Sequence, residues 1–206
     1  MKKKHLAILL SKLQGFENPK PELEQYRTPG DVAAELLWTA AQFGDIEGRV
    51  VADLGTGTGV LAIGAKLLGA EKVYAVEVDE SALEIARKNA KRAGVEVEFL
   101  RMDVSEFSKK VDTVVMNPPF GSQRKHADRP FLLKAFEVAD VVYSIHLAKP
   151  EVRNFIKTFS EEHNFVPRLL STVYFEIPAQ FFFHRKQLER ITTDLYQLER
   201  APSKDI

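Results

Sequence analysis

Short apolar runs alternate with longer stretches of helical spacing along the chain from residue 49 onward. The runs are rich in β-branched and aromatic residues, a composition typical of buried strands. Strands are therefore predicted at 49–55, 72–79, 95–100, 111–117 and 139–146, with longer β-rich segments at 168–178 and 190–199. Residues 60–68 and 80–93 have helical spacing, and Gly94 is expected to end the second helix.

This alternation of strands and helices predicts an α/β fold. Repeated βαβ units give a doubly wound, mostly parallel sheet with helices on both faces. The two last β-rich segments are expected to pair as a hairpin. In such a sheet a ligand binds beyond the carboxyl ends of the early strands, so the residues that follow those strands are the first candidates for a site.

An N-terminal extension precedes these units. Its leucines recur at helical spacing, at Leu6, Leu9, Leu10 and Leu13. We expect residues 1–28 to pack as a partly helical extension on a single domain that spans 1–206. Thr28 is interpreted as the N-cap of the next helix, with Pro29 at the first helical position and Asp31 in the first turn.

Composition narrows the possible functions. The chain has 206 residues, 29 basic and 29 acidic side chains and no cysteine, so disulfides and thiolate metal sites are excluded. Its five histidines lack metal-ligand spacing, and no metal site is expected. A zero net charge means that a polyanion would have to bind local basic clusters. No signal peptide or membrane span is apparent, so we expect a cytoplasmic protein.

A glycine-rich turn, "DLGTGTG", joins the first predicted strand to the first predicted helix of the sheet. Gly55, Gly57 and Gly59 allow close approach of a ligand to the backbone, and the helix that follows offers unpaired amides to an anionic group. Asp53 precedes the turn. A tight turn without a ligand is the alternative interpretation of these residues taken alone.

Glu77 ends the second predicted strand, some twenty residues after the turn. A carboxylate in this place can accept hydrogen bonds from both hydroxyls of a ribose. By itself Glu77 is also compatible with a solvated charge at a strand end. Together with Asp53 and the glycine-rich turn it indicates a nucleoside site.

The fourth predicted strand ends in the sequence Asn117, Pro118, Pro119 and Phe120. Neither proline can donate to a strand ladder, and the residue before a proline is restricted to extended geometry. The Asn117 side-chain carbonyl and the Pro118 main-chain carbonyl can each accept one N–H of a planar amine. This frees the lone pair of that nitrogen to attack a methyl donor, while Phe120 offers a flat face to a planar substrate.

The "DLGTGTG" turn resembles the first motif of the seven-stranded, Rossmann-like S-adenosylmethionine-dependent methyltransferases. The resemblance implies that Glu77 binds the ribose, and that the Asp103 side chain and the Val104 amide meet the adenine. A plain turn aspartate is the alternative for Asp103. The resemblance also implies a set of residues around the methionine moiety, made up of Asp53, Gly55, Gly57, Thr58 and Val60.

The chain as a whole resembles the small rRNA adenine-N6 methyltransferases of archaea and eukaryotes. The resemblance rests on "GFENPKPELEQYRTP", "MNPPFGS", "VVYSIH" and "FFFHRK", and so covers nearly the whole chain. It implies that Gln25 and Thr28 belong to the cofactor pocket and that Tyr26 helps to close it. The alternatives are a glutamine of an extended segment and a helix cap. Relatives in this group bind a small zinc-containing activator protein along the edge strand, which here is 95–104.

Three basic clusters are candidates for binding the phosphates of RNA. They comprise Lys2 to His5, then Arg124 and Lys125 with His126 and Arg129, and finally His184, Arg185 and Lys186. Solvated faces are the alternative interpretation of each cluster. The aromatic run 181–183 either stacks on bases or belongs to the hairpin core.

These features favour an enzyme that methylates the N6 amine of adenine in structured ribosomal RNA. A protein glutamine-N5 methyltransferase shares the chemistry of two carbonyl acceptors, but that group usually has tyrosine where Phe120 stands. A DNA adenine methyltransferase is disfavoured because no target-recognition domain is present. The alternative outside catalysis is an assembly factor that binds cofactor and RNA, which the intact motif at 117–120 disfavours.

Overall fold

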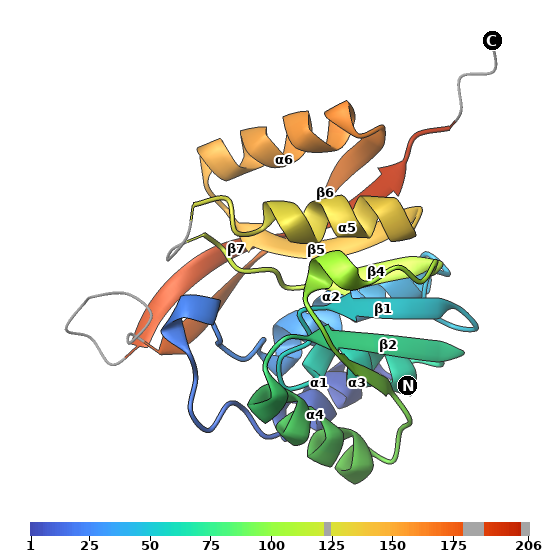
Figure 1. The fold of residues 1–206 in the computed structure, drawn as a ribbon, viewed down its shortest axis with the longest axis vertical. Coiled ribbons are helices and arrows are strands. Elements are labelled where there is room, and N and C mark those ends of the chain that lie inside the picture. The colour runs from blue at the N-terminus through green and yellow to red at the C-terminus, as the bar shows by residue number, and fades with distance from the viewer. Residues whose placement is uncertain (122–124, 179–187, 203–206) are drawn as a thin grey trace.

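A computed structural model describes residues 1–121, 125–178 and 188–202 of the chain (Figure 1). The strands are β1 (Val50–Leu54), β2 (Lys72–Glu77), β3 (Glu98–Arg101), β4 (Thr113–Met116), β5 (Val141–Leu147), β6 (Phe165–Pro178) and β7 (Leu188–Arg200). The α-helices are α1 (Lys3–Ser11), α2 (Gly30–Gln42), α3 (Val60–Leu67), α4 (Glu80–Ala93), α5 (Arg129–Val138) and α6 (Pro150–Glu162). Two short 3-10 helices are η1 (Pro21–Leu23) and η2 (Val104–Glu106).

The described strands form one seven-stranded sheet in the order β3-β2-β1-β4-β5-β7-β6. β1 to β5 are parallel, and β7 runs antiparallel to both of its neighbours. The strand order reverses between β1 and β4, the place where a doubly wound sheet opens a crevice for a ligand. The doubly wound, mostly parallel sheet and the terminal hairpin are thus confirmed.

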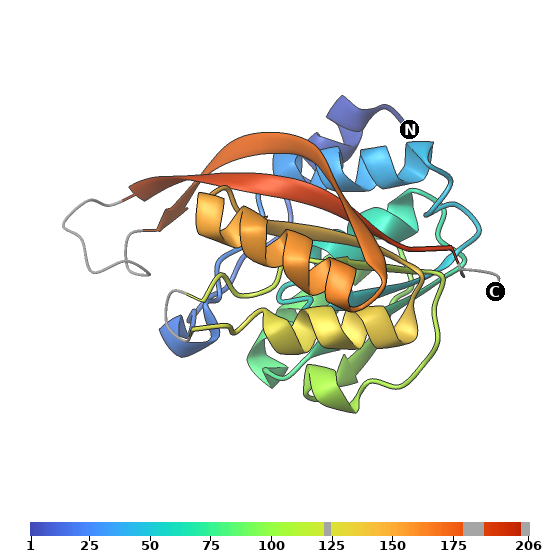
Figure 2. The same ribbon diagram turned by 90° about the horizontal axis from the view of Figure 1, so that it is seen from above.

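Helices cover both faces of the sheet. Side chains of α1, α2, α3 and α4 share one apolar cluster, and those of α5 and α6 share the other. Successive residues of a strand point to opposite faces, and accordingly Val51 joins the first cluster while Ala52 joins the second. Figure 2 shows α1 and α2 on one side of the sheet and α5 and α6 on the other. Among the described residues, every helix is too short or too polar to cross a bilayer.

Two predicted boundaries are corrected. β3 begins at Glu98 rather than at residue 95, so that strand is short. The helix after the N-terminal extension begins at Gly30, with Pro29 in extended geometry before it and no side-chain cap. A glycine is needed at that start because a Cβ on Gly30 would lie 2.3 Å from Ser11 Oγ of the crossing helix. Thr28 is therefore not a helix cap, and its hydroxyl has a different partner.

Side-chain hydrogen bonds hold the N-terminal extension together and fix it to α4 and the glycine-rich turn. Arg27 donates to the carbonyls of Leu13 (2.7 Å), Leu10 (3.0 Å) and Ser11 (2.7 Å), and so closes the carboxyl end of α1. Asn89, fully buried on α4, accepts from Gln14 N and donates to Gln14 O, each at 2.9 Å. Its amide also donates to Thr58 O at 2.9 Å. One side chain thus joins the extension to the glycine-rich turn.

Replacing Asn89 with alanine should lower the free energy of unfolding by about 3 kcal/mol, because the buried polar groups of Gln14 and Thr58 lose their partner. Urea denaturation measures the change. Asn154→Ala, at an exposed position on α6, is the matched control and should change stability by less than about 0.5 kcal/mol. Equal effects of the two substitutions would contradict the structural role of Asn89.

Candidate functional site

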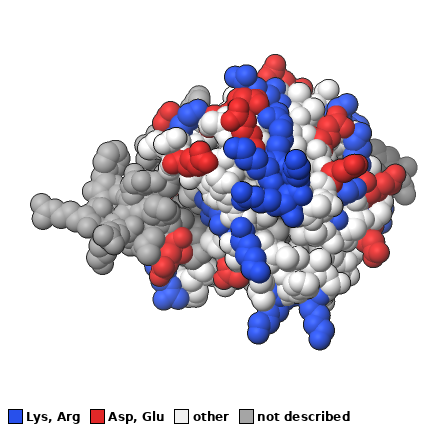
Figure 3. Space-filling model, turned by 90° about the horizontal axis from the view of Figure 1, so that it is seen from below, with Lys and Arg blue, Asp and Glu red and all other residues white. Residues whose placement is uncertain are grey.

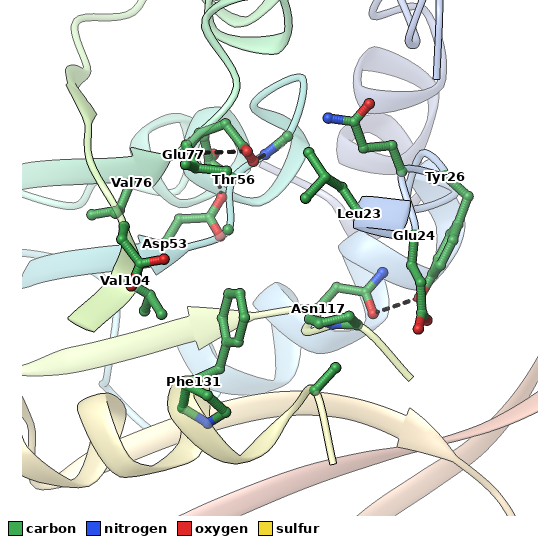
Figure 4. A pocket seen from close by; sticks show the side chains of 18 of the residues that line it. Leu23, Glu24, Tyr26, Asp53, Thr56, Val76, Glu77, Val104, Asn117 and Phe131 are labelled. Carbon is green, nitrogen blue, oxygen red and sulfur yellow. Dashed lines mark hydrogen bonds between the residues drawn. The ribbon is translucent and has the colours of Figure 1, made fainter. Parts of the chain in front are cut away.

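A cavity of about 690 Å³ lies beyond the carboxyl ends of β1, β2 and β4, where the strand order reverses. Its walls come from the N-terminal segment 16–28, the glycine-rich turn, the end of β2 and the loops after β3 and β4 (Figure 4). The predicted site residues that line it are Gln25, Thr28, Asp53, Gly55, Gly57, Thr58, Val60, Glu77, Asp103, Val104, Asn117, Pro119, Lys125 and Arg129. The fold therefore brings together residues from both halves of the chain.

Two aromatic rings cover the glycine-rich turn. Gly55 and Gly57 have φ of 75° and 55°, in the left-handed region that favours glycine. A Cβ on Gly55 would lie 2.8 Å from the ring of Phe131, and one on Gly57 would lie 2.9 Å from the ring of Phe16. Both rings line the cavity. Neither was predicted from the sequence, because an isolated phenylalanine carries no signal of its position.

Glu77 is held rigidly at the end of β2. Its Oε2 accepts from Gly57 N at 2.9 Å, and its Oε1 accepts from Val78 N at 3.0 Å and Asp79 N at 3.1 Å. Burial raises the pKa of the Glu77 carboxyl, although these hydrogen bonds oppose the shift. Since Oε2 receives a single N–H, it keeps acceptor capacity for a donor of a ligand in the cavity.

Asp53 is buried at the floor of the cavity. Its Oδ2 accepts from Thr56 Oγ1 at 2.6 Å and from Ala62 N at 3.0 Å, whereas its Oδ1 is enclosed without a hydrogen-bond partner. Burial raises the pKa of Asp53 to about 7. Thr58 Oγ1 is likewise enclosed and unpartnered. An orphaned carboxylate oxygen is costly, and a cationic donor from a ligand would relieve that cost.

Asp103 lies at the opposite rim of the cavity and caps η2. Its Oδ1 accepts from Ser105 Oγ at 2.6 Å and from Ser105 N at 2.9 Å, and these hydrogen bonds hold its pKa below the usual range. Glu106 accepts from Asp103 N at 2.9 Å. The cap fixes Asp103 and the adjoining Val104 in the cavity wall. Asp103 is thus both a turn residue and a residue that lines the cavity.

Gln25 connects the N-terminal segment to the start of α4. Its Nε2 donates to Asp79 Oδ2 at 2.7 Å, and its Oε1 accepts from Lys20 N at 2.9 Å. Burial disfavours the ionised form of Asp79, but hydrogen bonds from Gln25, Lys20 and Ser81 outweigh it and lower the pKa to about 2. The Gln25 amide thus holds the wall of the cavity in position.

The Asn117 carboxamide is positioned by the same segment. Its Nδ2 donates to Thr28 Oγ1 at 3.0 Å, and Tyr26 donates its hydroxyl to Asn117 Oδ1 at 3.4 Å (Figure 4). Because the Thr28 hydroxyl accepts from the NH₂ end, the carbonyl end has a defined direction. Oδ1 has two lone pairs and the Tyr26 contact is long, so it can still accept a hydrogen bond from a ligand.

Glu24 fixes the residues that follow Asn117. Its Oε2 accepts from Phe120 N at 2.7 Å, and its own backbone is left-handed with φ of 49°. The rings of Tyr26 and Phe120 stack, with centroids 5.2 Å apart and an angle of 30°. Burial, together with the Glu24 charge, raises the pKa of Tyr26. Glu24 was not predicted to contribute to the site, because its partner lies 96 residues away in the sequence.

The Phe120 ring stacks on Tyr26 and packs against the core, so the flat face expected for a substrate does not line the cavity. Pro118 is buried, and of the two prolines Pro119 lines the cavity. Lys125 and Arg129 stand exposed at the cavity, and the Arg129 guanidinium lies over the ring of Phe155 at 5.2 Å. Other predicted phosphate-binding residues lie outside the described residues, namely Arg124, His184, Arg185 and Lys186, as does the aromatic run 181–183. The cluster from Lys2 to His5 lies at the start of α1 and does not line the cavity.

Within the described residues, no group of three or more histidine, aspartate or glutamate side chains could hold a metal ion. The site offers instead a buried carboxylate, a rim of backbone and carboxylate acceptors, and a carboxamide fixed in one orientation. This donor set suits an organic ligand with hydroxyl and amine donors.

Comparisons with known proteins identify the family of the chain. A family model, the methyltransferase small domain, matches residues 27–139. A Danio rerio protein named rRNA N(6)-adenosine-methyltransferase METTL5 is 37% identical over 202 residues, which are 94% of this chain and 97% of the relative. An uncharacterized protein of Methanocaldococcus jannaschii is 39% identical over 97% of this chain and 95% of its own length.

A solved structure is also similar over its full length. The crystal structure of a Pyrococcus horikoshii protein superposes with a TM-score of 0.93 at 63% identity, covering 98% of this chain and 99% of that chain. That protein is named as a candidate RNA methyltransferase. The likeness extends over the N-terminal segment, the sheet and the hairpin together.

The raised pKa of Asp53 predicts a specific pH dependence. Folding favours its protonated form, so this contribution is fully present below the unfolded pKa of 3.8 and is lost as the pH rises through about 7. Between about pH 4 and about pH 8 the ligand-free wild type should lose roughly 2–4 kcal/mol more stability than Asp53→Asn. Urea denaturation of both proteins across that range measures the difference. Parallel pH profiles would show that Asp53 titrates normally.

Proposed function

Because this chain belongs to the methyltransferase small domain family, we propose that it methylates the N6 amine of adenine in structured ribosomal RNA, with S-adenosylmethionine as the donor. The observation that carries the proposal is the Asn117 carboxamide, oriented at the cavity by Thr28 and Tyr26 and followed by two prolines and Phe120. The names of full-length relatives support the choice of substrate.

The residues around the cavity fit the cofactor. Glu77 Oε2, which accepts one backbone N–H, would also accept from a ribose hydroxyl, and the Asp103 side chain with the Val104 amide would meet the adenine at the other rim. The unpartnered Oδ1 of Asp53 suits the ammonium of the methionine moiety. The remaining wall of this subsite comprises Gln25, Thr28, Gly55, Gly57, Thr58 and Val60.

When bound, the cofactor supplies an electrophilic methyl group, and the protein has to make an unreactive amine attack it. The lone pair of an exocyclic amine is delocalised into the base. Asn117 Oδ1 and the Pro118 carbonyl would each accept one N–H and so hold the nitrogen with its lone pair directed at the methyl group. As the nitrogen–carbon bond forms, the methyl–sulfur bond would break and a neutral thioether would leave. No basic side chain is required, because the amine becomes acidic only once it is methylated and then loses its proton to solvent.

The surroundings of the motif favour RNA over a protein substrate. Phe120 occupies the place where glutamine-N5 methyltransferases usually have tyrosine, and its ring is stacked on Tyr26. Lys125 and Arg129 stand at the cavity as potential phosphate ligands. A protein glutamine-N5 methyltransferase remains the competing hypothesis that an experiment has to distinguish.

The test is methyl transfer from labelled cofactor to separated ribosomal RNA and ribosomal protein fractions, followed by digestion and nucleoside analysis. The proposal predicts label in RNA, recovered as N6-methyladenosine. Label in glutamine of a protein fraction would support the competing hypothesis. Cofactor binding without any transfer would support a non-catalytic assembly factor.

Asn117→Ala should lower the rate of methyl transfer by about 100-fold or more while cofactor affinity stays nearly unchanged, because the side chain acts on the target nitrogen. Single-turnover kinetics and calorimetry measure the two quantities. Asn154→Ala, on the exposed face of α6, is the control and should retain full activity. Retention of most activity by Asn117→Ala would exclude the proposed chemistry.

Glu77→Ala should have the opposite signature and weaken cofactor binding by roughly 1.5–3 kcal/mol, the usual cost of losing a charged acceptor. Because Glu77 also accepts three backbone N–H groups, the folded fraction of the variant has to be checked by circular dichroism. Glu77→Gln, which keeps the shape, should show an intermediate loss. Unchanged affinity in a folded Glu77→Ala protein would remove the carboxylate from the cofactor site.

We also propose that a partner, the small zinc-containing activator expected from the resemblance, pairs with the open edge of β3. β3 is an outer strand of the sheet, and a groove of about 840 Å³ lies beside it. On the face of the molecule seen from below in Figure 3, lysine and arginine side chains gather near the middle, with acidic side chains around them. The groove is lined by charged side chains of both signs and by apolar residues of 95–99, and Lys72 is paired with Glu98 at 2.9 Å. An open edge beside apolar residues suits a partner that adds a strand.

A bound activator should protect the backbone amides of residues 95–100 from hydrogen exchange, and the complex should be more stable or more active than the isolated chain. Exchange mass spectrometry with and without the partner measures the protection. Strong protection of these amides and full activity in the isolated chain would show that Glu96 and Glu98 merely shield the edge.

A further inference from the structure

The β6–β7 hairpin extends beyond the other strands. In Figures 1 and 2 it projects on the same side of the molecule as η1 and the loop before α5. Residues of η1 and of that loop line the cavity. The hairpin is long, with strands of 14 and 13 residues. A strand pair of this length provides a surface next to the cavity that the methyl-transfer chemistry does not use.

The alternation of side chains assigns the two faces of this hairpin. Val173, Ile191 and Leu195 join the apolar cluster of α1 to α4. Asp194 lies on the other face, where it accepts two hydrogen bonds from Arg153 of α6, at 2.6 and 3.0 Å. Arg190 is four residues before Asp194 on β7 and therefore shares its face.

Tyr174 and Arg190 form an exposed pair on that face. Tyr174 is opposite Thr192, two residues along β7 from Arg190, and the Arg190 guanidinium lies 4.6 Å from the centroid of the Tyr174 ring. Tyr174 is 58% exposed, the largest exposed fraction among the large hydrophobic side chains of the described residues. What sets Tyr174 apart from the other exposed apolar side chains is the guanidinium over its ring, because an aromatic face beside a cation is a surface on which a nucleotide can bind.

A second pair of the same chemistry stands at the cavity. The Arg129 guanidinium lies over the rings of Phe155 and Phe159, at 5.2 and 5.9 Å, and Arg129 also lines the cavity. These residues come from α5 and α6, the helices on the face of the sheet that carries Tyr174 and Arg190. Both pairs therefore lie on one face of the sheet, and a chain of nucleotides that leaves the cavity over this face would run toward the hairpin pair.

We propose that Tyr174 and Arg190 bind a single-stranded nucleotide that flanks the target adenine, with its base stacked on the ring and its phosphate paired with the guanidinium. Unpaired RNA is recognised in this way, by aromatic faces beside a cation, and the stacking is tolerant of base identity. The inference rests on the proposed function, since it specifies how the RNA substrate is held outside the methyl-transfer site.

The test compares steady-state methylation of an rRNA fragment by matched variants. Tyr174→Ala should raise KM for RNA about tenfold with kcat nearly unchanged, and Tyr174→Phe, which keeps the ring, should stay within about twofold of wild type. Arg190→Gln should reduce the salt slope of RNA binding by about one. Arg168→Gln is the control, because that exposed β6 arginine lies over Phe43 after α2 and should leave both quantities unchanged.

The outcomes separate this inference from the proposed function. If wild type does not methylate rRNA, the proposed function fails before any variant is compared. If wild type methylates rRNA and Tyr174→Ala keeps the wild-type KM, the stacking site is wrong. A change of oligomeric state in Tyr174→Ala, seen by sedimentation, would overturn it as well, because the face would then be an interface between copies of the chain.

Discussion

Two hydrogen bonds hold the side-chain amide of Asn117 between Thr28 and Tyr26, and the proposed chemistry depends on that orientation. A carboxamide has a donor end and an acceptor end of nearly equal size. The Thr28 hydroxyl accepts from the NH₂ end and so leaves the carbonyl end for the substrate amine. Glu24 adds a third contact at the Phe120 amide, so the residues after β4 are held from one segment of the N-terminal extension.

The extension can act as this support because it is itself fixed. Asn89 joins it to the glycine-rich turn, and Gln25 joins it to Asp79 at the start of α4. The cofactor side and the substrate side of the cavity therefore share one wall. The same cavity is lined by two carboxylates, the buried Asp53 and the half-buried Glu77, and loss of solvent raises the pKa of both. Ligand donors would relieve that cost, so cofactor binding should also stabilise the fold.

Patterns local in the sequence predicted much of this structure. The strands, the parallel sheet, the hairpin, the glycine-rich turn and the positions of Asp53 and Glu77 at the cavity all follow from spacing over short windows. Contacts between residues far apart in the sequence could not be predicted from such windows. Asn89, for example, lies 75 residues from Gln14, and its neighbours in the sequence are those of an ordinary helical residue. Thr28 was open to two interpretations, since a threonine before a proline fits a helix cap, and only the helix crossing at Gly30 decides against it.

The most direct test of the central claim is a double-mutant cycle between Thr28 and Asn117 in single-turnover methyl transfer. Thr28→Val keeps the shape of the side chain and removes the acceptor for Asn117 Nδ2, whereas Thr28→Ser retains it. If Thr28 acts by orienting Asn117, Thr28→Val slows the wild-type background and has no further effect in an Asn117→Ala background, and Thr28→Ser has little effect in either. Rate losses that multiply in the double variant would contradict the account, because Thr28 would then contribute independently of the Asn117 amide.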